Sequence, residues 1–68
     1  MHVTKRERDI LQLICKSNPE ISEILGIRLT TVKAIIHNML ERFDTQNRTG
    51  LILKALKNNL IALEDIAE

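Results

Sequence analysis

The sequence has few of the residues that form aromatic cores, tight turns or cross-links. Its 68 residues include one phenylalanine and neither tryptophan nor tyrosine, so a core must consist of isoleucine and leucine around Phe43. Two glycines and one proline leave few turns, which favours helices over strands. A single cysteine excludes an internal disulfide. These shortages predict a small all-α protein.

Long apolar runs are also missing. No run approaches the roughly 18 residues of a membrane span, and residues 1–9 lack the apolar stretch of a secretory signal. We therefore expect a soluble, cytoplasmic protein without membrane contact. The length predicts one domain, 1–68, which buries only about 60% of its unfolded surface and needs a partner or an ideal helical core.

Positive charge is concentrated in the first part of the chain. All ten lysines and arginines precede residue 58, and six acids there leave a net charge of +4. The acidic tail 62–68 then lowers the total to +1. A positive body attracts phosphate, although an ordinary mixed-charge surface has a similar balance.

The stretch 26–43 has a polar and an apolar face. On a helix that turns about 100° per residue, its apolar and polar residues fall on opposite sides. The apolar stripe contains Val32, Ile36, Met39, Leu40 and Phe43, and the polar face contains Thr30, Lys33, Ala34, His37 and Glu41. This pattern predicts a helix over 29–43, with Arg28 as a poor N-cap and Thr30 as the alternative cap.

A second, shorter helix precedes that stretch. Ile21, Ile24 and Leu25 repeat at helical spacing, and Gly26 can take the positive φ that ends a helix. Two short helices joined by such a turn form a helix-turn-helix, here at about 19–43, whose second helix is shaped to enter a DNA major groove.

Two capping boxes mark the first two helix starts. Thr4 and Glu7 form a T-x-x-E box, so the first helix begins near residue 5. Ser17 and Glu20 repeat the box, and the second helix is expected from 18 or 19 to 25.

A fourth helix is expected at about 48–60, with Asn47 as its cap and Asn58 or Asn59 as its stop. Its apolar residues cover about 200° of the circumference, whereas one packed face needs little more than 100°. The surplus predicts a homodimer interface. This interface contains Ile52, Leu53, Leu56 and Leu60. Gly50 is expected to weaken the helix by roughly 1 kcal/mol, and the tail either extends the helix or frays.

Three separate blocks resemble one known family. VTKRERDILQLI, EISEILGIRLTTVKAIIHNML and NRTGLILKALKNNLI stand in the order of the LuxR/FixJ-type (GerE-like) helix-turn-helix domain of bacterial transcription regulators. The resemblance covers about residues 3–61. It implies four helices, of which the third reads DNA and the fourth often forms a dimer, and it implies that Arg48 ties the last turn together. The chain departs from the family at Arg28, Ile35 and Gly50, and its first connection is about two residues shorter.

The resemblance also implies which residues approach DNA. Its base-contacting positions hold Lys33, Ala34 and His37. A lysine donates to guanine or phosphate, an alanine contacts a thymine methyl, and a histidine does either according to its protonation. The full set of predicted DNA-binding residues is Lys5, Arg28, Thr30, Thr31, Lys33, Ala34 and His37.

Other site chemistries have little support. Cys15 follows Ile14 on the apolar stripe of the first helix, so we expect a buried core thiol. His37 has no ligand-like partner, and His2 is the one other histidine, so no metal or cofactor is expected. The chain has neither a nucleophile–base pair nor a glycine-rich phosphate loop, which argues against an enzyme.

Two functions from different classes remain. The first is a sequence-specific DNA-binding domain of a bacterial transcription regulator, which reads double-stranded DNA with helix 29–43 and dimerises through helix 48–60. The second is a divergent helix-turn-helix protein that binds another regulator rather than DNA. Lys33 and the positive body favour the first function. Arg28, Ile35, Gly50 and the short connection favour the second.

Overall fold

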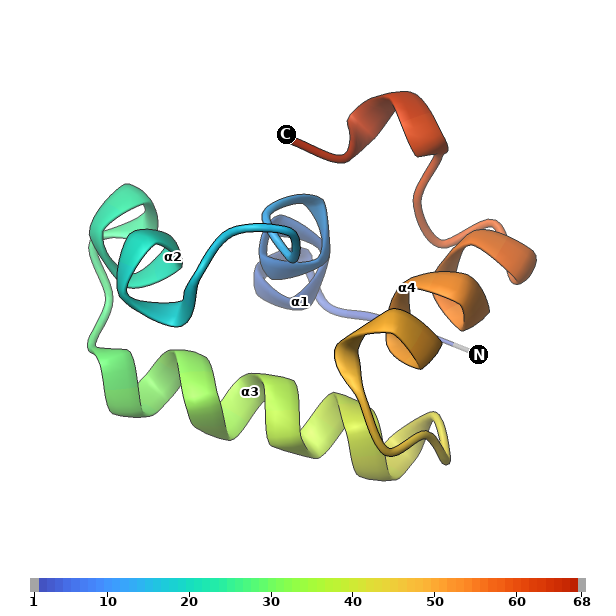
Figure 1. The fold of residues 1–68 in the computed structure, drawn as a ribbon, viewed down its shortest axis with the longest axis horizontal. Helices are drawn as coiled ribbons and strands as arrows, with labels where there is room; N and C mark the ends of the chain where they lie inside the picture. The colour runs from blue at the N-terminus through green and yellow to red at the C-terminus, as the bar shows by residue number, and fades with distance from the viewer. Residues whose placement is uncertain (1, 68) are drawn as a thin grey trace.

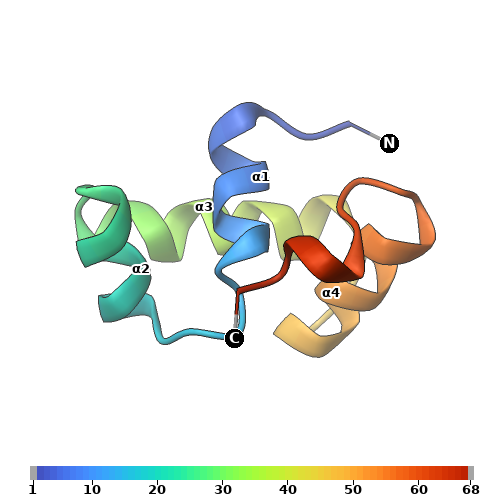
Figure 2. The ribbon, with the colours of Figure 1, turned by 90° about the horizontal axis from the view of Figure 1, so that it is seen from above.

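Four α-helices and one short 3-10 helix make up the fold of residues 2–67, the part of the chain that the computed structural model describes. The elements are α1 (Lys5–Gln12), α2 (Asn18–Leu25), α3 (Leu29–Arg42), α4 (Arg48–Lys57) and η1 (Leu63–Asp65). The long helix α3 forms one side of the molecule, and α1, α2 and α4 lie together against it (Figure 1). Seen from above, α1 crosses α3, with α2 and α4 on either side (Figure 2). The predicted all-α fold is confirmed.

The core lies between α3 and the other three helices. Phe43 and the largest aliphatic side chains around it are almost completely buried. The core residues are Val3, Ile10, Leu11, Ile14, Ile21, Val32, Ile36, Met39, Phe43, Leu51, Ala55 and Ile61. The predicted apolar stripe of α3 is confirmed, since four of its members belong to this set and Leu40 packs half-buried against it. Ile35, at the flank of the stripe, packs against the core as well.

The two predicted capping boxes are both present. In the first, Thr4 Oγ1 accepts from the Glu7 N–H at 3.1 Å, and Glu7 Oε1 accepts from the Thr4 N–H at 2.9 Å. Ser17 and Glu20 repeat the pair of bonds at 3.3 and 3.1 Å. The Ser17 N–H, donating to the Glu20 carboxylate, lowers the pKa of that carboxyl. Helices α1 and α2 therefore begin where local sequence places them.

The turn between α2 and α3 is built on Gly26. Gly26 takes a left-handed φ of 66°, and the N–H of Ile27 donates to the Ser22 carbonyl at 3.1 Å. Arg28 is the N-cap of α3 and makes no side-chain capping bond, as predicted. The helix begins at Leu29, so the alternative in which Thr30 is the cap is wrong.

Cys15 is exposed, and the prediction of a buried core thiol is wrong. Helix α1 ends at Gln12, before the apolar stripe reaches the cysteine. The chain then turns, because Ser17 needs an extended backbone to cap α2. Ile14 still enters the core from this turn, while the next side chain faces outward.

Helix α4 is three residues shorter than predicted and ends at Lys57. Asn47 caps its start and Asn59, with a φ of 57°, follows its end, as expected. Gly50 lies in the first turn, where an added Cβ would clash with Thr45 Oγ1. A larger residue here would require the Thr45 side chain to move, so this close approach favours glycine, and the predicted cost of Gly50 to the helix stays a prediction.

The C-terminal segment folds back over the molecule. Ile61 is buried, η1 follows, and the N–H of Ala67 donates to the carbonyl of Gln12 in α1 at 2.7 Å. The tail thus neither extends α4 nor frays, contrary to the expectation. Glu68, the last acid of the predicted tail, lies outside the described residues.

Candidate nucleic-acid interface

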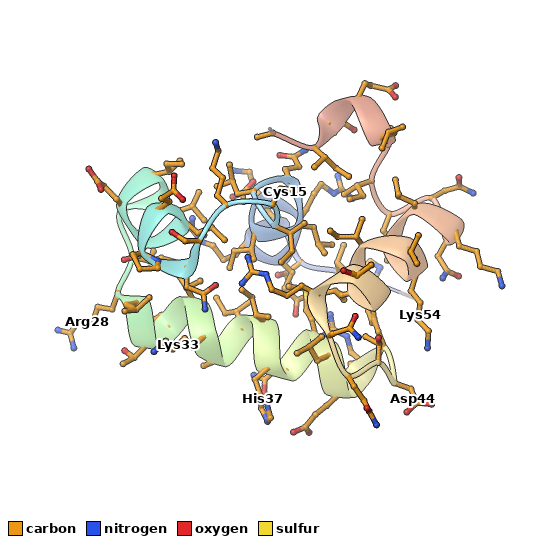
Figure 3. The ribbon with its side chains drawn as sticks, viewed as in Figure 1. Cys15, Arg28, Lys33, His37, Asp44 and Lys54 are labelled. Atoms are coloured by element: carbon orange, nitrogen blue, oxygen red, sulfur yellow. The ribbon has the colours of Figure 1, made fainter. Side chains whose placement is uncertain are left out.

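The outer face of α3 carries most of the predicted DNA-binding residues. Thr30, Thr31, Lys33, Ala34 and His37 are all exposed on this helix, and the exposed Arg28 directly precedes it. Figure 3 shows His37 on the side of α3 that faces away from the other helices and Arg28 at the start of the helix. The structure therefore gathers six of the seven predicted residues on one surface.

Lys5 comes from a different element. It is the exposed first residue of α1, and Arg6 beside it lies 3.9 Å from Asp9 across one helical turn. Lys5 is thus available to solvent, but the outer face of α3 is formed without it.

An acidic side chain stands beside His37 on this face. Glu41, one turn further along α3, places Oε1 2.5 Å from His37 Nε2. The side chains are 68% exposed for His37 and 70% exposed for Glu41. The pair is ionic when the imidazole is protonated. Sequence reasoning placed Glu41 on the polar face but missed this pairing, although the i, i+4 spacing is a signal for it.

Arg42 is turned away from the outer face. Its Nη2 donates to Glu7 Oε1 at 2.8 Å, and its guanidinium carbon lies 5.5 Å from the centre of the Phe43 ring. The Arg42 hydrogen bond, assisted by the Thr4 N–H, lowers the pKa of the Glu7 carboxyl against the opposing effect of burial. The pair fixes the C-terminal end of α3 to the start of α1, a contact across 35 residues that local patterns do not reveal.

Two cations of α4 hold backbone carbonyls. Arg48 Nη2 donates to the carbonyls of Ile14 and Lys16, each at 2.7 Å, and its Nη1 donates to the Asn18 side chain. The resemblance implied that Arg48 stabilises the turn between α3 and α4, whereas these bonds connect it to the segment between α1 and α2.

Lys54 performs a similar function at the end of α3. Its Nζ donates to the carbonyl of Phe43 at 2.6 Å and to that of Asp44 at 3.0 Å. These carbonyls follow the last turn of α3, where no further turn supplies N–H donors. Lys54 and Arg48 therefore use their charges in contacts within the fold.

The four residues of the predicted dimer interface differ in exposure. Leu53 is 61% exposed, whereas Ile52, Leu56 and Leu60 are half-buried and pack against the core. The surplus apolar arc of α4 is therefore partly used within the chain, and Leu53 is its open part.

Residues 2–67 lack the features of two other classes of site. This part of the chain contains no group of three or more His, Cys, Asp or Glu side chains placed to hold a metal ion. None of its helices combines the length and apolar character that crossing a bilayer demands.

Comparison with known proteins assigns the chain to a family. Residues 1–55 match the family described as bacterial regulatory proteins, luxR family. Over 61 residues the chain is 41% identical to the response regulator protein VraR of Staphylococcus aureus, Staphylococcus saprophyticus and Staphylococcus epidermidis, which covers 87% of this chain and 29% of each relative. The chain thus spans less than a third of the length of these curated relatives. No solved structure matches it at comparable significance. With four helices in the expected order and a family match over most of its length, the chain belongs to the luxR family of bacterial regulatory proteins.

Proposed function

We propose that residues 1–68 form one DNA-binding domain of a bacterial transcription regulator, in which α3 enters the major groove of double-stranded DNA. The observation that supports this proposal is that α3 has a buried apolar face and an outer face of exposed polar side chains. A helix is about 10–12 Å wide with its side chains, and the major groove is about 12 Å wide. Such a regulator acts in the cytoplasm, where bacterial DNA lies.

The residues of the outer face have separate roles in this proposal. Lys33 donates to guanine O6 or N7, and Ala34 contacts a thymine methyl. Arg28, Thr30 and Thr31 lie at the N-terminal end of α3, where they meet phosphates as the helix enters the groove. His37 reads a base edge one turn beyond Lys33, and Lys5 adds a phosphate contact from α1.

The proposal includes a homodimer, because three of the ten cations of one copy are already bonded within the fold. Of the basic residues before position 58, Arg42, Arg48 and Lys54 are hydrogen-bonded within the fold. A second copy doubles the number of phosphate contacts, and a two-fold axis through α4 sets two α3 helices about one DNA turn, roughly 34 Å, apart. Leu53 would form the centre of this interface, with Ile52, Leu56 and Leu60 around it.

The second candidate function is binding to another regulator in place of DNA. The exposed Leu53 on α4 is the observation that favours it. Two of the sequence departures that favoured it have structural reasons instead. Ile35 packs against the core, and Gly50 makes room for Thr45. We therefore retain DNA binding as the first function.

An electrophoretic shift assay with random duplex DNA at low and moderate salt tests the proposal. We expect a shifted band at low salt that weakens as salt rises, because phosphate contacts release counterions. Far-UV circular dichroism on the same sample controls for folding. A folded chain that shifts no duplex at either salt concentration contradicts the proposal and favours the second candidate.

A further inference from the structure

We propose that Glu41 is a specificity-determining residue of α3, which selects a C·G base pair by accepting a hydrogen bond from the cytosine amino group. The inference rests on the proposed function, since it requires α3 to lie in the major groove. It adds a residue that the predicted DNA-binding set does not contain.

Glu41 lies on α3 in line with two of the residues that are proposed to meet the bases. Lys33, His37 and Glu41 follow one another at intervals of four residues, so their side chains form a row along α3. All three are exposed. Figure 3 shows that His37, the middle member of this row, lies on the side of α3 that the other helices leave uncovered.

A carboxylate in this row opposes DNA binding unless the DNA supplies a donor. Glu41 is the one acidic residue within Leu29–Arg42, and phosphates repel it. The neighbouring Arg42 does not neutralise it, because that guanidinium is bonded to Glu7. Glu41 therefore disfavours most duplexes and requires a hydrogen-bond donor from the groove in those it accepts.

The chemistry of the base edges identifies the donor. A carboxylate only accepts hydrogen bonds. In the major groove, guanine presents the acceptors O6 and N7, and thymine presents the acceptor O4, so both repel it. Adenine presents its amino donor beside the acceptor N7, whereas cytosine presents its amino group without an acceptor beside it on the same base. Glu41 thus favours cytosine.

His37 holds the carboxylate in place for this contact. Its Nε2 lies against Oε1 of Glu41, which leaves Oε2 for the base. A side chain restrained before binding loses less conformational freedom when the complex forms. His37 is therefore a positioning residue for Glu41 in addition to its own proposed contact.

The test is selection from a library of randomised duplexes, comparing the wild-type chain with Glu41→Gln. The matched control is Glu64→Gln, which removes the same charge from the exposed surface of η1, on the side of the molecule opposite α3 (Figure 1). We expect wild type and Glu64→Gln to prefer cytosine at one position by on the order of tenfold. Glu41→Gln should lose this preference and move toward adenine, because glutamine donates to N7 and accepts from N6 of adenine.

The role of His37 has its own readout in the same selection. His37→Gln should reduce the cytosine preference at that position, and the double variant with Glu41→Gln should show no further loss there, since the two residues act as one unit. An unchanged cytosine preference in His37→Gln overturns the positioning role.

Two failures can be told apart in this experiment. If Glu41→Gln binds every duplex more tightly with unchanged base preferences, Glu41 only repels phosphate and the inference is wrong. If folded wild-type chain retains no duplex at low salt, the proposed function itself fails.

Discussion

Helices α3 and α4 differ in the character of the face that each turns away from the core. Both bury one apolar face in the same core, through Val32 and Ile36 on α3 and through Leu51 and Ala55 on α4. The opposite face of α3 is polar and exposed, whereas the rest of α4 carries three further apolar residues, Ile52, Leu53 and Leu56, beside its polar and basic ones. The width of an apolar arc therefore predicts how much contact a helix makes, and it does not identify the contacting partner.

The C-terminal segment accounts for part of the difference. Ile61 is buried in the core and Ile66 packs against it, so residues beyond α4 contribute to the packing around the helix. Leu56 and Leu60 also lie half-buried on the core. Only the arc around Leu53 keeps the exposure that a dimer interface needs.

The largest expected effect is a loss of stability, which should follow truncation on the buried side of α3 and not on its outer face. Phe43 is 1% exposed, and Phe43→Ala should destabilise the fold by about 3–5 kcal/mol through lost burial and a residual cavity. A chain of this size has roughly 3–10 kcal/mol of stability, so much of the variant should be unfolded. Urea denaturation followed by circular dichroism measures the loss. Lys33→Ala is the control, and an equal loss there would mean that the outer face is assigned wrongly.

The next effect concerns the open part of α4. Leu53→Glu should keep the fold but give a monomer by sedimentation, because it places a charge at the centre of the proposed two-fold interface. Affinity for a duplex with two sites should fall about 100-fold, as the second copy no longer binds with the first. Ile24→Glu, the same substitution at an exposed apolar residue of α2, should leave the sedimentation unchanged. A wild-type chain that sediments as a monomer at high micromolar concentration would refute the dimer.

A smaller effect is expected at Lys33, on the polar face of α3. Lys33→Ala should weaken DNA binding by about 1–3 kcal/mol and relax the base preference at one position, if its ammonium reads guanine. Fluorescence anisotropy with a selected duplex measures the change. Lys57→Ala removes the same charge from an exposed position on α4 and should change the affinity for DNA little. Equal losses of affinity in the two variants would mean that Lys33 contributes only its positive charge and does not read a base.

The smallest effect tests the attachment of α3 to α1. Glu7→Gln should cost about 1 kcal/mol at neutral pH, a low figure because Arg42 is partly exposed and solvent screens the pair. The Arg42 hydrogen bond lowers the folded-state pKa of Glu7 below 4.5, so its stabilisation is present above pH 4.5 and disappears as pH falls through the folded-state pKa. Thermal melts of the two proteins should therefore converge in acid. A constant difference at all pH values would contradict the ionic origin.

Sequence reasoning succeeded where the structure depends on neighbouring residues. Thr4 with Glu7, Ser17 with Glu20, and Gly26 all act across a few residues, and each marks a helix end correctly. The two faces of α3 likewise follow from helical periodicity alone. Local physical chemistry thus determines the helices and the candidate DNA-facing surface.

The errors arise where distant segments compete with the local pattern. The apolar period of α1 continues to Cys15, but the helix ends at Gln12 because the cap of α2 lies so close. The pairing of Arg42 with Glu7 joins residues 35 apart, and no periodic signal links them. The return of the tail to α1 is equally non-local.

The bonds from Arg48 and Lys54 also set an order of events during synthesis. Both side chains donate to carbonyls that lie earlier in the chain, up to 34 residues upstream for Arg48. While the ribosome still shields residues 48–54, the carbonyls of Ile14, Lys16 and Phe43 lack these donors. The first three helices therefore leave the ribosome before these bonds can form, and α3 is complete before the carbonyl that follows it gains the Lys54 donor.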